Sequence, residues 1–425
     1  MTEIRLKYGD GELTGRAPDG VFAGSIGPET SEPDVSADEI VRRALDSPIG
    51  SPPLVDLASG ARTASILIPG KTRVAATRTY VPALVDELER AGVPRDGIEV
   101  FLATGTHEHH LECDVSSLLG DETAARVRTV FHDCFDESGL EQLGTTSFGT
   151  PVLVSRRVLD SDVRILTGRI VPHYFAGFSG GRKALLPGVA GFRTIKANHR
   201  LTLDPVRGLH PNARPCILDG NPIHLDMVEG MRMAGPMFCL NTLLDTSHRL
   251  VDAVAGDAEA AHVEGCRRAD RLHRTRLEAP VDAVITSAGG SPYDCNFMQS
   301  LKAVMNVRDA VRPGGSILWV AECPFGIDPD FLRWAAIESD AELESAVRER
   351  YNLKGHNTLM LRHLTRKADV ALCSSLPEAD VRAMGFQPVS SLGEGLNWLR
   401  DRLGAGFSYL VAPNANVTCA TVGTD

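Results

Sequence analysis

One stretch, residues 169–200, constrains this chain more than any other. It reads RIVPHYFAGFSGGRKALLPGVAGFRTIKANHR and places His173, Lys183 and His199 around a run of glycines. An imidazole titrates near neutral pH, and glycines let backbone N–H groups approach an anion closely. No other stretch is as dense in residues that catalyse, bind metal or hold phosphate. We therefore expect the rest of the chain to hold this segment against a second domain.

Length and composition narrow the class of protein. A chain of 425 residues is too long for one ordinary core, so two domains are expected. The 43% hydrophobic and 23% charged contents are typical of a soluble globular protein. The net charge of -11 argues against a nucleic-acid-binding surface, which needs clustered Lys and Arg.

The polar N-terminus lacks the apolar core of a signal peptide, and no run of 18 apolar residues could cross a membrane. The nine cysteines are scattered and form no CxxC pair, which favours a reducing, cytoplasmic setting. We expect Cys113, Cys134 and Cys295 to be packing residues, because free cysteine is usually buried.

The first half of the chain alternates strands and helices. Residues 64–70 and 98–107 are predicted strands that flank a helix over 80–92, and a third strand, 163–173, enters the central segment. Asp38 is a candidate cap for an earlier helix. Because polar residues follow the strand ends, a ligand is expected at the carboxyl edge of a parallel sheet.

A long polar helix over residues 257–273 separates this half from a second α/β series, which suits a connection between domains. We predict an N-terminal cofactor-binding and catalytic domain over residues 1–272 and a C-terminal domain over 273–425, whose last strand or tail packs back on the first. The predicted fold class is α/β: two domains with Rossmann-like sheets and an active-site cleft between them.

The glycine-rich turn has two interpretations. Gly177, Ser179, Gly180 and Gly181 could cradle an anion, with charge from the neighbouring Arg182. The sequence is neither GxGxxG nor GxxxxGK[ST], so a standard dinucleotide or triphosphate site is not indicated. A tight turn between strand and helix explains the same glycines equally well.

The histidines outside this turn also allow alternatives. A lone histidine is more often structural, but His173 and His199 flank a glycine-rich loop and a lysine, which favours catalysis. His107 follows a strand end, where active-site loops of such sheets lie. The neighbouring His109 and His110 suggest zinc, although no set of four ligands is visible.

Three further residues are candidates for binding a carboxylate. Arg73 follows a strand end, and arginine binds carboxylates with two parallel hydrogen bonds; a surface ion pair is the alternative, and the better one for Arg78. Gln299 and Lys302 are three residues apart and share a helix face, although such a lysine is ordinarily solvated.

Residues 173–199, with the ATGTH and GGSPYDCNFMQSLKA segments in the expected order, closely resemble the signature of the nickel-dependent lactate racemase family. The resemblance covers nearly the whole chain and implies a two-domain isomerase. It also implies a nickel-pincer nucleotide, a pyridinium mononucleotide that binds nickel through sulfur, carbon and sulfur. Such soft ligands and one imidazole suit Ni(II).

The resemblance assigns roles to individual residues. Lys183 matches the lysine joined to the cofactor, and His199 matches the histidine that completes the nickel coordination. His107 and His173 match the acid/base pair, Arg73 and Lys302 match the residues that hold the substrate carboxylate, and Gln299 lines the substrate site. The remaining predicted cofactor-binding residues are Thr72, Gly177, Ser179, Gly180 and Gly181.

The family mechanism has a physical logic. Because C2–H of a 2-hydroxy acid is a very weak acid, hydride leaves C2 for the cofactor while a histidine takes the hydroxyl proton, giving a planar 2-keto acid. Hydride then returns to the opposite face, so two histidines are needed. The resemblance also implies maturation enzymes that build the cofactor, and protein made without them would lack it. A homodimer is a further expectation.

Departures from the family pattern bear on the substrate. The family often has Asp-x-Thr-Arg-Pro-Thr-Pro where this chain has GKTRVAA, so the acidic residue is missing and Lys71 lies beside its position. Ser291 and Met298 stand where lactate enzymes commonly have aromatic residues. We therefore predict a 2-hydroxy acid other than lactate, and extra charge from Lys71 or Arg78 favours malate. The alternatives are a sugar-acid 2-epimerase on the same scaffold and a nickel- or nucleotide-binding protein without turnover.

Overall fold

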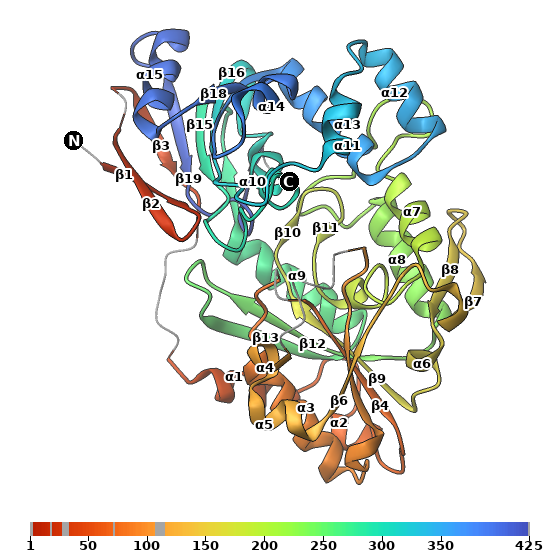
Figure 1. Cartoon of the computed structure of the whole chain (residues 1–425). Coiled ribbons are helices and arrows are strands. Elements are labelled where there is room, and N and C mark those ends of the chain that lie inside the picture. The colour runs from red at the N-terminus through yellow and green to blue at the C-terminus, as the bar shows by residue number, and fades with distance from the viewer. Residues whose placement is uncertain (1–2, 18, 28–33, 71–72, 107–114, 424–425) are drawn as a thin grey trace.

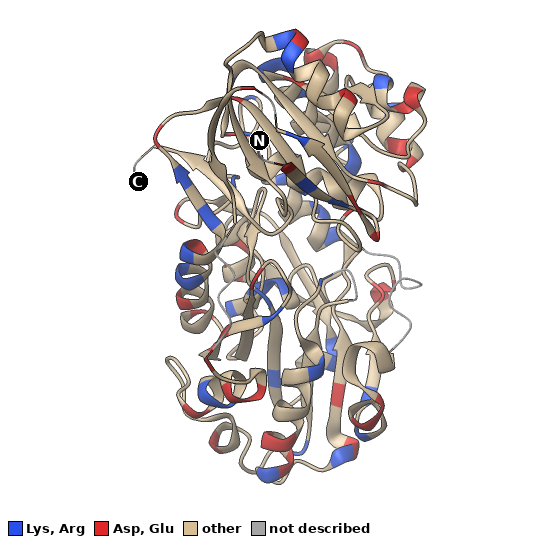
Figure 2. Cartoon of the chain, turned by 90° about the vertical axis from the view of Figure 1, so that its left-hand side faces the viewer, with Lys and Arg blue, Asp and Glu red and all other residues tan. Residues whose placement is uncertain are grey.

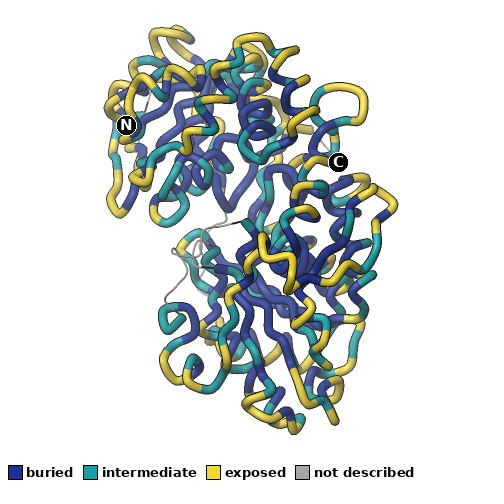
Figure 3. Tube along the Cα trace, turned by 45° about the vertical axis from the view of Figure 1, so that its right-hand side comes forward, coloured by how far each residue is buried: buried dark blue, intermediate teal, exposed yellow. Residues whose placement is uncertain are grey.

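The chain folds into two α/β halves that lie one above the other (Figure 1). The structure is a computed structural model, which describes residues 3–17, 19–27, 34–70, 73–106 and 115–423. Each half is built on a six-stranded sheet. Buried backbone runs through the middle of both halves (Figure 3). The predicted two-domain α/β fold is thus confirmed, whereas the predicted cleft between the domains stays a prediction.

The first sheet has the strand order β13-β12-β9-β4-β5-β6. Its hairpin β12–β13 is antiparallel, and its other neighbours are parallel. The predicted strands over 64–70, 98–107 and 163–173 exist but end a few residues earlier. The strands are β4 (Ala64–Ile68), β5 (Ile98–Leu102), β6 (Arg128–Phe131), β9 (Val163–Arg169), β12 (Phe238–Leu244) and β13 (Leu250–Asp257).

Continuous apolar sequence explains why these strands are central. All five residues of β4 are buried, as expected for a parallel strand covered on both faces. Helix α3 (Thr77–Arg90) packs an apolar face against the sheet, and its Tyr80 hydroxyl lies 2.9 Å from Thr167 Oγ1 on β9. This packing fixes the sheet edge from which the site residues project.

The second sheet is parallel throughout and has the order β18-β17-β16-β15-β19-β3. Its edge strand β3 comes from the start of the chain, and the hairpin β1–β2 packs on the same half through Ile4 and Leu6. Strands β1, β2 and β3 therefore accompany the second sheet, unlike the predicted grouping of residues 1–272. The strands are β1 (Glu3–Tyr8), β2 (Gly11–Arg16), β3 (Val21–Ser25), β15 (Val281–Ser287), β16 (Val311–Val320), β17 (Ala368–Cys373), β18 (Gln387–Val389) and β19 (Ser408–Ala412).

Helices cover both sheets, and one predicted cap is wrong. Ser36, not Asp38, caps the first helix, because its side chain accepts the Glu39 N–H. The helices besides α3 are α1 (Ala37–Asp46), α2 (Leu54–Leu57), α4 (Val115–Leu119), α5 (Asp121–Arg126), α6 (Arg156–Leu159), α7 (Phe192–Arg200), α8 (Pro222–Met233), α9 (Ala260–His273), α10 (Phe297–Val307), α11 (Pro329–Ala335), α12 (Asp340–Glu349), α13 (Leu353–Lys367), α14 (Glu378–Ala383) and α15 (Leu392–Leu403). Short 3-10 turns are η1 (Arg95–Gly97), η3 (Glu137–Gly139) and η4 (Gly181–Ala184).

Small strand pairs complete the fold. These are β7 (Leu140–Thr145) with β8 (Pro151–Ser155), β10 (Pro172–His173) with β11 (Gly177–Phe178), and β14 (Arg274–Leu277) with β20 (Cys419–Val422). Strand β20 is the last strand of the chain that the structure describes. Cys419 of β20 places its sulfur 3.0 Å from that of Cys216, so the end of the chain contacts the first half.

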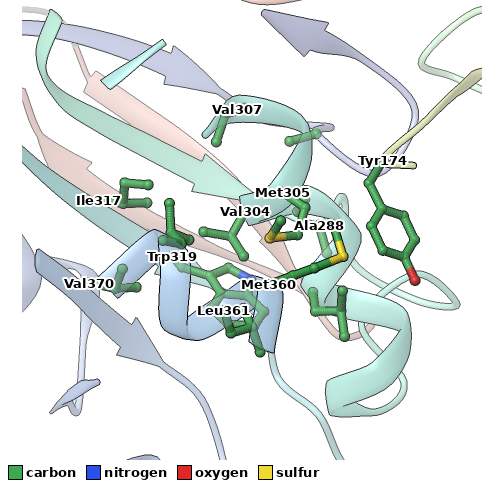
Figure 4. Close-up of a cluster of buried hydrophobic side chains, with 14 of the residues drawn as sticks. Tyr174, Ala288, Val304, Met305, Val307, Ile317, Trp319, Met360, Leu361 and Val370 are labelled. Carbon is green, nitrogen blue, oxygen red and sulfur yellow. The ribbon is translucent and has the colours of Figure 1, made fainter. Parts of the chain in front are cut away.

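The two halves share one hydrophobic cluster. Tyr174, from the segment between β10 and β11, packs with residues of the second half such as Met305 and Met360 (Figure 4). In the view of Figure 2, Lys and Arg lie among Asp and Glu along the helices. Within the described ranges, no helix is both long enough and apolar enough to cross a membrane.

Candidate active site

The candidate site lies where three neighbouring parallel strands end. Strands β9, β4 and β5 are adjacent, and Arg73 and His173 lie a few residues beyond β4 and β9. The carboxyl ends of parallel strands are the usual place for a ligand in such sheets. His107, which follows β5, and Thr72 lie outside the described residues, so their predicted roles stay predictions.

Phe175 is the centre around which the predicted residues gather. Its ring makes edge contacts with His173 at 4.6 Å and with His199 at 5.2 Å, measured between ring centroids. Lys183 Nζ lies 5.7 Å from the centre of the same ring and 3.4 Å from His173 Nε2. The structure therefore brings His173, Lys183 and His199 together.

Helix α7 positions His199 in its last turn. Buried hydrogen bonds hold this helix: Thr194 Oγ1 accepts the Leu153 N–H, and Asn198 Nδ2 donates to Asp226 Oδ2 at 2.8 Å. Burial, followed by the charge of Lys183, lowers the pKa of His199 to about 3. Its Nδ1 atom is buried and has no hydrogen-bond partner within the described residues. The ring is thus a neutral imidazole with a free nitrogen.

The environment of Lys183 disfavours the charged form of its amine. Burial lowers its pKa well below the ordinary value, and the nearby Arg182 and Arg73 lower it further. A lysine amine that loses its proton easily is a nucleophile. This chemistry is what a covalent attachment at Lys183 requires.

Gln299 links the two halves at the site. Its Oε1 accepts a hydrogen bond from Lys302 Nζ at 2.6 Å and another from Arg73 Nη1 at 3.1 Å. Burial, then Arg73 and Lys183, lower the pKa of Lys302. The shared acceptor therefore holds a first-half arginine beside a second-half lysine, an arrangement that suits one carboxylate.

The same positive charges act on His173. Burial lowers its pKa well below 6.5, and Lys183, Lys302 and Arg73 lower it further. Its Nδ1 accepts the Ala176 N–H at 3.3 Å, which leaves Nε2 on the side of Lys183. Because Nδ1 accepts, the hydrogen of the neutral ring lies on Nε2, and the ring must exchange tautomers before Nε2 can take a proton as a general base.

The glycine-rich turn is used within the protein itself. A side chain at Gly177 would meet the Ile217 carbonyl at 2.3 Å, and one at Gly181 would meet the His262 ring at 2.5 Å. The Gly181 N–H donates to Asn241 Oδ1 at 2.8 Å. Packing and positive φ angles of 74° and 49° thus explain these glycines.

Ser179 and Gly180 have similar explanations. The Ser179 hydroxyl donates to the Arg169 carbonyl and accepts the Val171 N–H. A side chain at Gly180 would meet Ile170 at 2.7 Å. The tight-turn interpretation therefore has direct support, and cofactor contacts by Gly177, Ser179, Gly180 and Gly181 stay predictions.

Arg182 does not face an external anion. It is fully buried and donates to the carbonyls of Ala176 and Phe178, and its Nη1 lies 2.6 Å from His262 Nε2. Burial lowers the pKa of Arg182 to about 10. Its role is to hold the loop that carries Lys183, not to supply charge at the loop surface.

The sequence did not point to several residues beside the site. Tyr174 stacks on His173 at 4.9 Å, and its hydroxyl donates to Asn357 Oδ1 at 3.1 Å. His356 makes an edge contact with Phe175 at 5.7 Å, and the Tyr351 hydroxyl lies 2.8 Å from its Nδ1. Tyr174 belongs to the 173–199 segment, whereas Tyr351, His356 and Asn357 lie on or beside α13, where no motif marks them.

Other candidates lie elsewhere. Arg78 is exposed, and the surface ion pair considered for it stays a prediction. Ser291 is exposed and lines a separate cavity of about 510 Å³ with the β1–β2 hairpin and residues 246–248. It therefore does not share a pocket with Met298. Lys71, His109, His110 and Cys113 lie outside the described residues, Cys134 is buried, and Cys295 is half-buried.

The residues at the site fit the predicted nickel-pincer nucleotide. No group of three His, Cys, Asp or Glu side chains that could bind a metal occurs in the described part of the chain. The single neutral imidazole of His199 suits a metal whose other ligands belong to an organic cofactor. Lys183 supplies an amine that is readily deprotonated, as an attachment point needs.

Together, the two α/β halves and the imidazole–amine cluster, with the Arg73–Gln299 hydrogen bond that links the halves, define the class of protein as an α/β enzyme. The family comparisons agree. Residues 8–209 match the lactate racemase N-terminal domain, and residues 277–417 match the lactate racemase C-terminal domain. The chain belongs to the lactate racemase family, and it is an isomerase of the racemase type.

Individual relatives cover most of the chain. It is 32% identical to a lactate racemase of Thermoanaerobacterium thermosaccharolyticum over 93% of this chain and 94% of that protein, and 32% identical to one of Lactiplantibacillus plantarum over 76% and 75%. The apoprotein structure of a T. thermosaccharolyticum lactate racemase superposes with a TM-score of 0.89 at 29% identity, covering 99% of this chain and all of that one. A Thermotoga maritima protein shares the fold, with a TM-score of 0.69 at 17% identity over 93% of this chain and all of its own.

Proposed function

We propose that this protein is a nickel-pincer nucleotide-dependent racemase or epimerase of a 2-hydroxy acid other than lactate. The observation that supports it most is the cluster in which Lys183 Nζ lies 3.4 Å from His173 Nε2, with His199 on the same phenylalanine ring. Arg73 and Lys302 complete the set from both halves. A protein that only carried nickel would not need two cations for a carboxylate beside a neutral histidine.

Each residue has a proposed task. Arg73 and Lys302 bind the C1 carboxylate, held side by side by Gln299. His173 accepts the proton of the C2 hydroxyl, because its lowered pKa keeps the ring neutral before the reaction. Lys183 forms the covalent link to the cofactor, and His199 binds the nickel. His107 is the proposed acid/base partner on the opposite face.

When bound, the cofactor supplies the acceptor and donor for the hydride of C2. As the hydroxyl loses its proton to His173, C2 becomes part of a planar 2-keto acid that Arg73 and Lys302 still hold by its carboxylate. Rotation about the C1–C2 bond presents the other face, and a proton returns to the oxygen from a histidine. The two cations therefore keep the intermediate in place while its carbonyl turns.

The cofactor must come from maturation enzymes, so the test needs protein matured with them. Loaded protein is incubated with single enantiomers of a panel of 2-hydroxy acids, and optical purity is followed by chiral chromatography. We expect loss of optical purity for at least one acid and a lower rate with lactate. Unchanged purity across the panel, with full nickel occupancy, would instead favour a binding protein without turnover.

A deuterium label tests the route. With a C2-deuterated substrate, hydride transfer keeps deuterium at C2 in both enantiomers, because the label does not pass through water. Proton abstraction from carbon would release the label to solvent. Substantial washout during racemisation would therefore refute the proposed hydride route while leaving the racemase activity intact.

A further inference from the structure

A line of contacts crosses from the acid/base histidine to the carboxylate-binding cations through residues with no assigned role. His173 stacks on Tyr174, whose hydroxyl donates to Asn357 Oδ1 at 3.1 Å. Asn357 Nδ2 lies 3.5 Å from Met298 Sδ, and Met298 directly precedes Gln299. Asn357 therefore contacts the neighbour of His173 on one side and the neighbour of Gln299 on the other.

The amide of Asn357 has a donor that the protein serves poorly. The residue is 2% exposed, and its Oδ1 is already occupied by the Tyr174 hydroxyl. The amide nitrogen has two hydrogens to donate, and it contacts the Met298 thioether, which is a weak acceptor. A buried donor without a good acceptor is unfavourable, and an oxygen atom brought by a ligand would relieve it.

Tyr174 fixes the direction of this amide. Its side chain is 5% exposed, and burial raises its pKa, so the hydroxyl keeps its proton and donates to Oδ1. With Oδ1 held there, Nδ2 is directed toward Met298, which is half-buried. The amide donor is therefore presented on the Met298 side of the site.

We propose that Asn357, oriented by Tyr174, recognises an acceptor oxygen on C3 or C4 of the substrate, so that the preferred 2-hydroxy acid carries a hydroxyl or carboxylate there instead of an alkyl group. The proposal rests on the proposed function, because Arg73, Lys302 and His173 must hold C1 and the C2 hydroxyl. With these fixed, the rest of the substrate extends from C2 toward either the cofactor side or Asn357 and Met298. On the latter side, the Asn357 amide is a donor whose present acceptor is a weak thioether.

Matched pairs of ligands test the proposal on the apoprotein, without dependence on nickel loading. Glycerate and 2-hydroxybutyrate differ by a hydroxyl in place of a methyl group, and malate and 2-hydroxyisocaproate differ by a carboxylate in place of an isopropyl group. Dissociation constants are measured by calorimetry for each single enantiomer. We expect the polar member of at least one pair to bind about tenfold more tightly, the effect of about one good hydrogen bond. The pair that shows the preference identifies the oxygen as hydroxyl or carboxylate.

Variants assign this preference to Asn357. Asn357→Leu, which keeps the volume and removes the donor, is expected to bring the ratio of dissociation constants close to one. Asn357→Asp replaces the donor by an anionic acceptor and is expected to weaken malate binding in particular. Arg366→Gln, on the exposed end of the same helix, is the matched control and should keep the wild-type ratio.

Several outcomes would overturn the proposal. One is a wild-type protein that binds the alkyl member of both pairs as tightly as the polar member. Another is an Asn357→Leu protein that folds, by circular dichroism, and keeps the preference. If that variant does not fold, Asn357→Asp decides, and unchanged malate binding there refutes the role. Failure of matured protein to racemise any acid would refute the proposed function but not the ligand preference.

Discussion

Replacing Lys183 with methionine should stabilise the apoprotein. Methionine keeps the length and volume of the side chain but removes an amine whose polar contact is a 3.4 Å approach to a histidine nitrogen. Burial and two nearby guanidinium groups lower the pKa of Lys183, which means that they disfavour its charged form. Because substituting apolar side chains for poorly compensated buried charges stabilises proteins by about 1–4 kcal/mol, we expect Lys183→Met to gain about 1–3 kcal/mol at pH 7.

The pH dependence gives this prediction a definite sign. A lysine whose pKa is lower in the folded state binds fewer protons when folded, so wild-type stability rises with pH up to the ordinary lysine value of 10.5. Lys183→Met has no amine and therefore lacks this contribution to the pH dependence of stability. Its advantage should therefore be largest below the lowered pKa of Lys183 and shrink as pH rises toward the ordinary lysine value.

Thermal and urea unfolding of the apoprotein measure the effect. A gain of 1 kcal/mol corresponds to about 2–4 °C in Tm for a domain of 150–250 residues. Lys196→Met, which changes an exposed lysine of α7, is the control and should have little effect. A Lys183→Met protein less stable than wild type at pH 7, or an advantage that does not shrink with rising pH, would refute the argument that this lysine is held at a cost to stability.

Three further substitutions test individual contacts in the candidate site and in the core of the first half. His199→Ala should lose nickel, measured by atomic emission, while intact mass still shows the adduct on Lys183; retained nickel would remove His199 from the metal site. Gln299→Leu should raise KM about tenfold, because the two hydrogen bonds that align the carboxylate-binding cations are lost. An unchanged KM would show that Arg73 and Lys302 align without Gln299. Tyr80→Phe should lower the free energy of unfolding by about 1 kcal/mol, since a buried hydrogen bond to Thr167 is lost; urea midpoints at unchanged slope would measure this, and no loss would show that the bond is neutral.

Much of the fold could be predicted because it depends on local pattern. The buried run of β4 and the apolar face of α3 are visible as periodicity, and the structure confirms both. The assignment of β3 to the second sheet could not be predicted, because it depends on pairing with β19 nearly 400 residues later. Residues 21–25 contain nothing that specifies which sheet they will join.

The candidate site divides in the same way. His173, Lys183 and His199 stood out because one segment contains them all, and the structure brings them onto Phe175. The positive charge that the sequence offers to an anion at the turn, that of Arg182, is buried in the structure, because packing and not the neighbouring glycines decides burial. Asn357 carried no signal, since its position depends on where α13 docks.

The sequence alone determined the chemistry available: a dense segment of imidazoles, an amine and turns, within two α/β series that must each bury a sheet. Only the tertiary structure decided which groups share an environment. Gln299 acquires its role when α10 meets Arg73 from the other half, and Asn357 when α13 meets Tyr174. The physical reason is that side-chain type and periodicity are properties of the chain, whereas burial, lowered pKa values and paired donors arise when distant segments exclude water together.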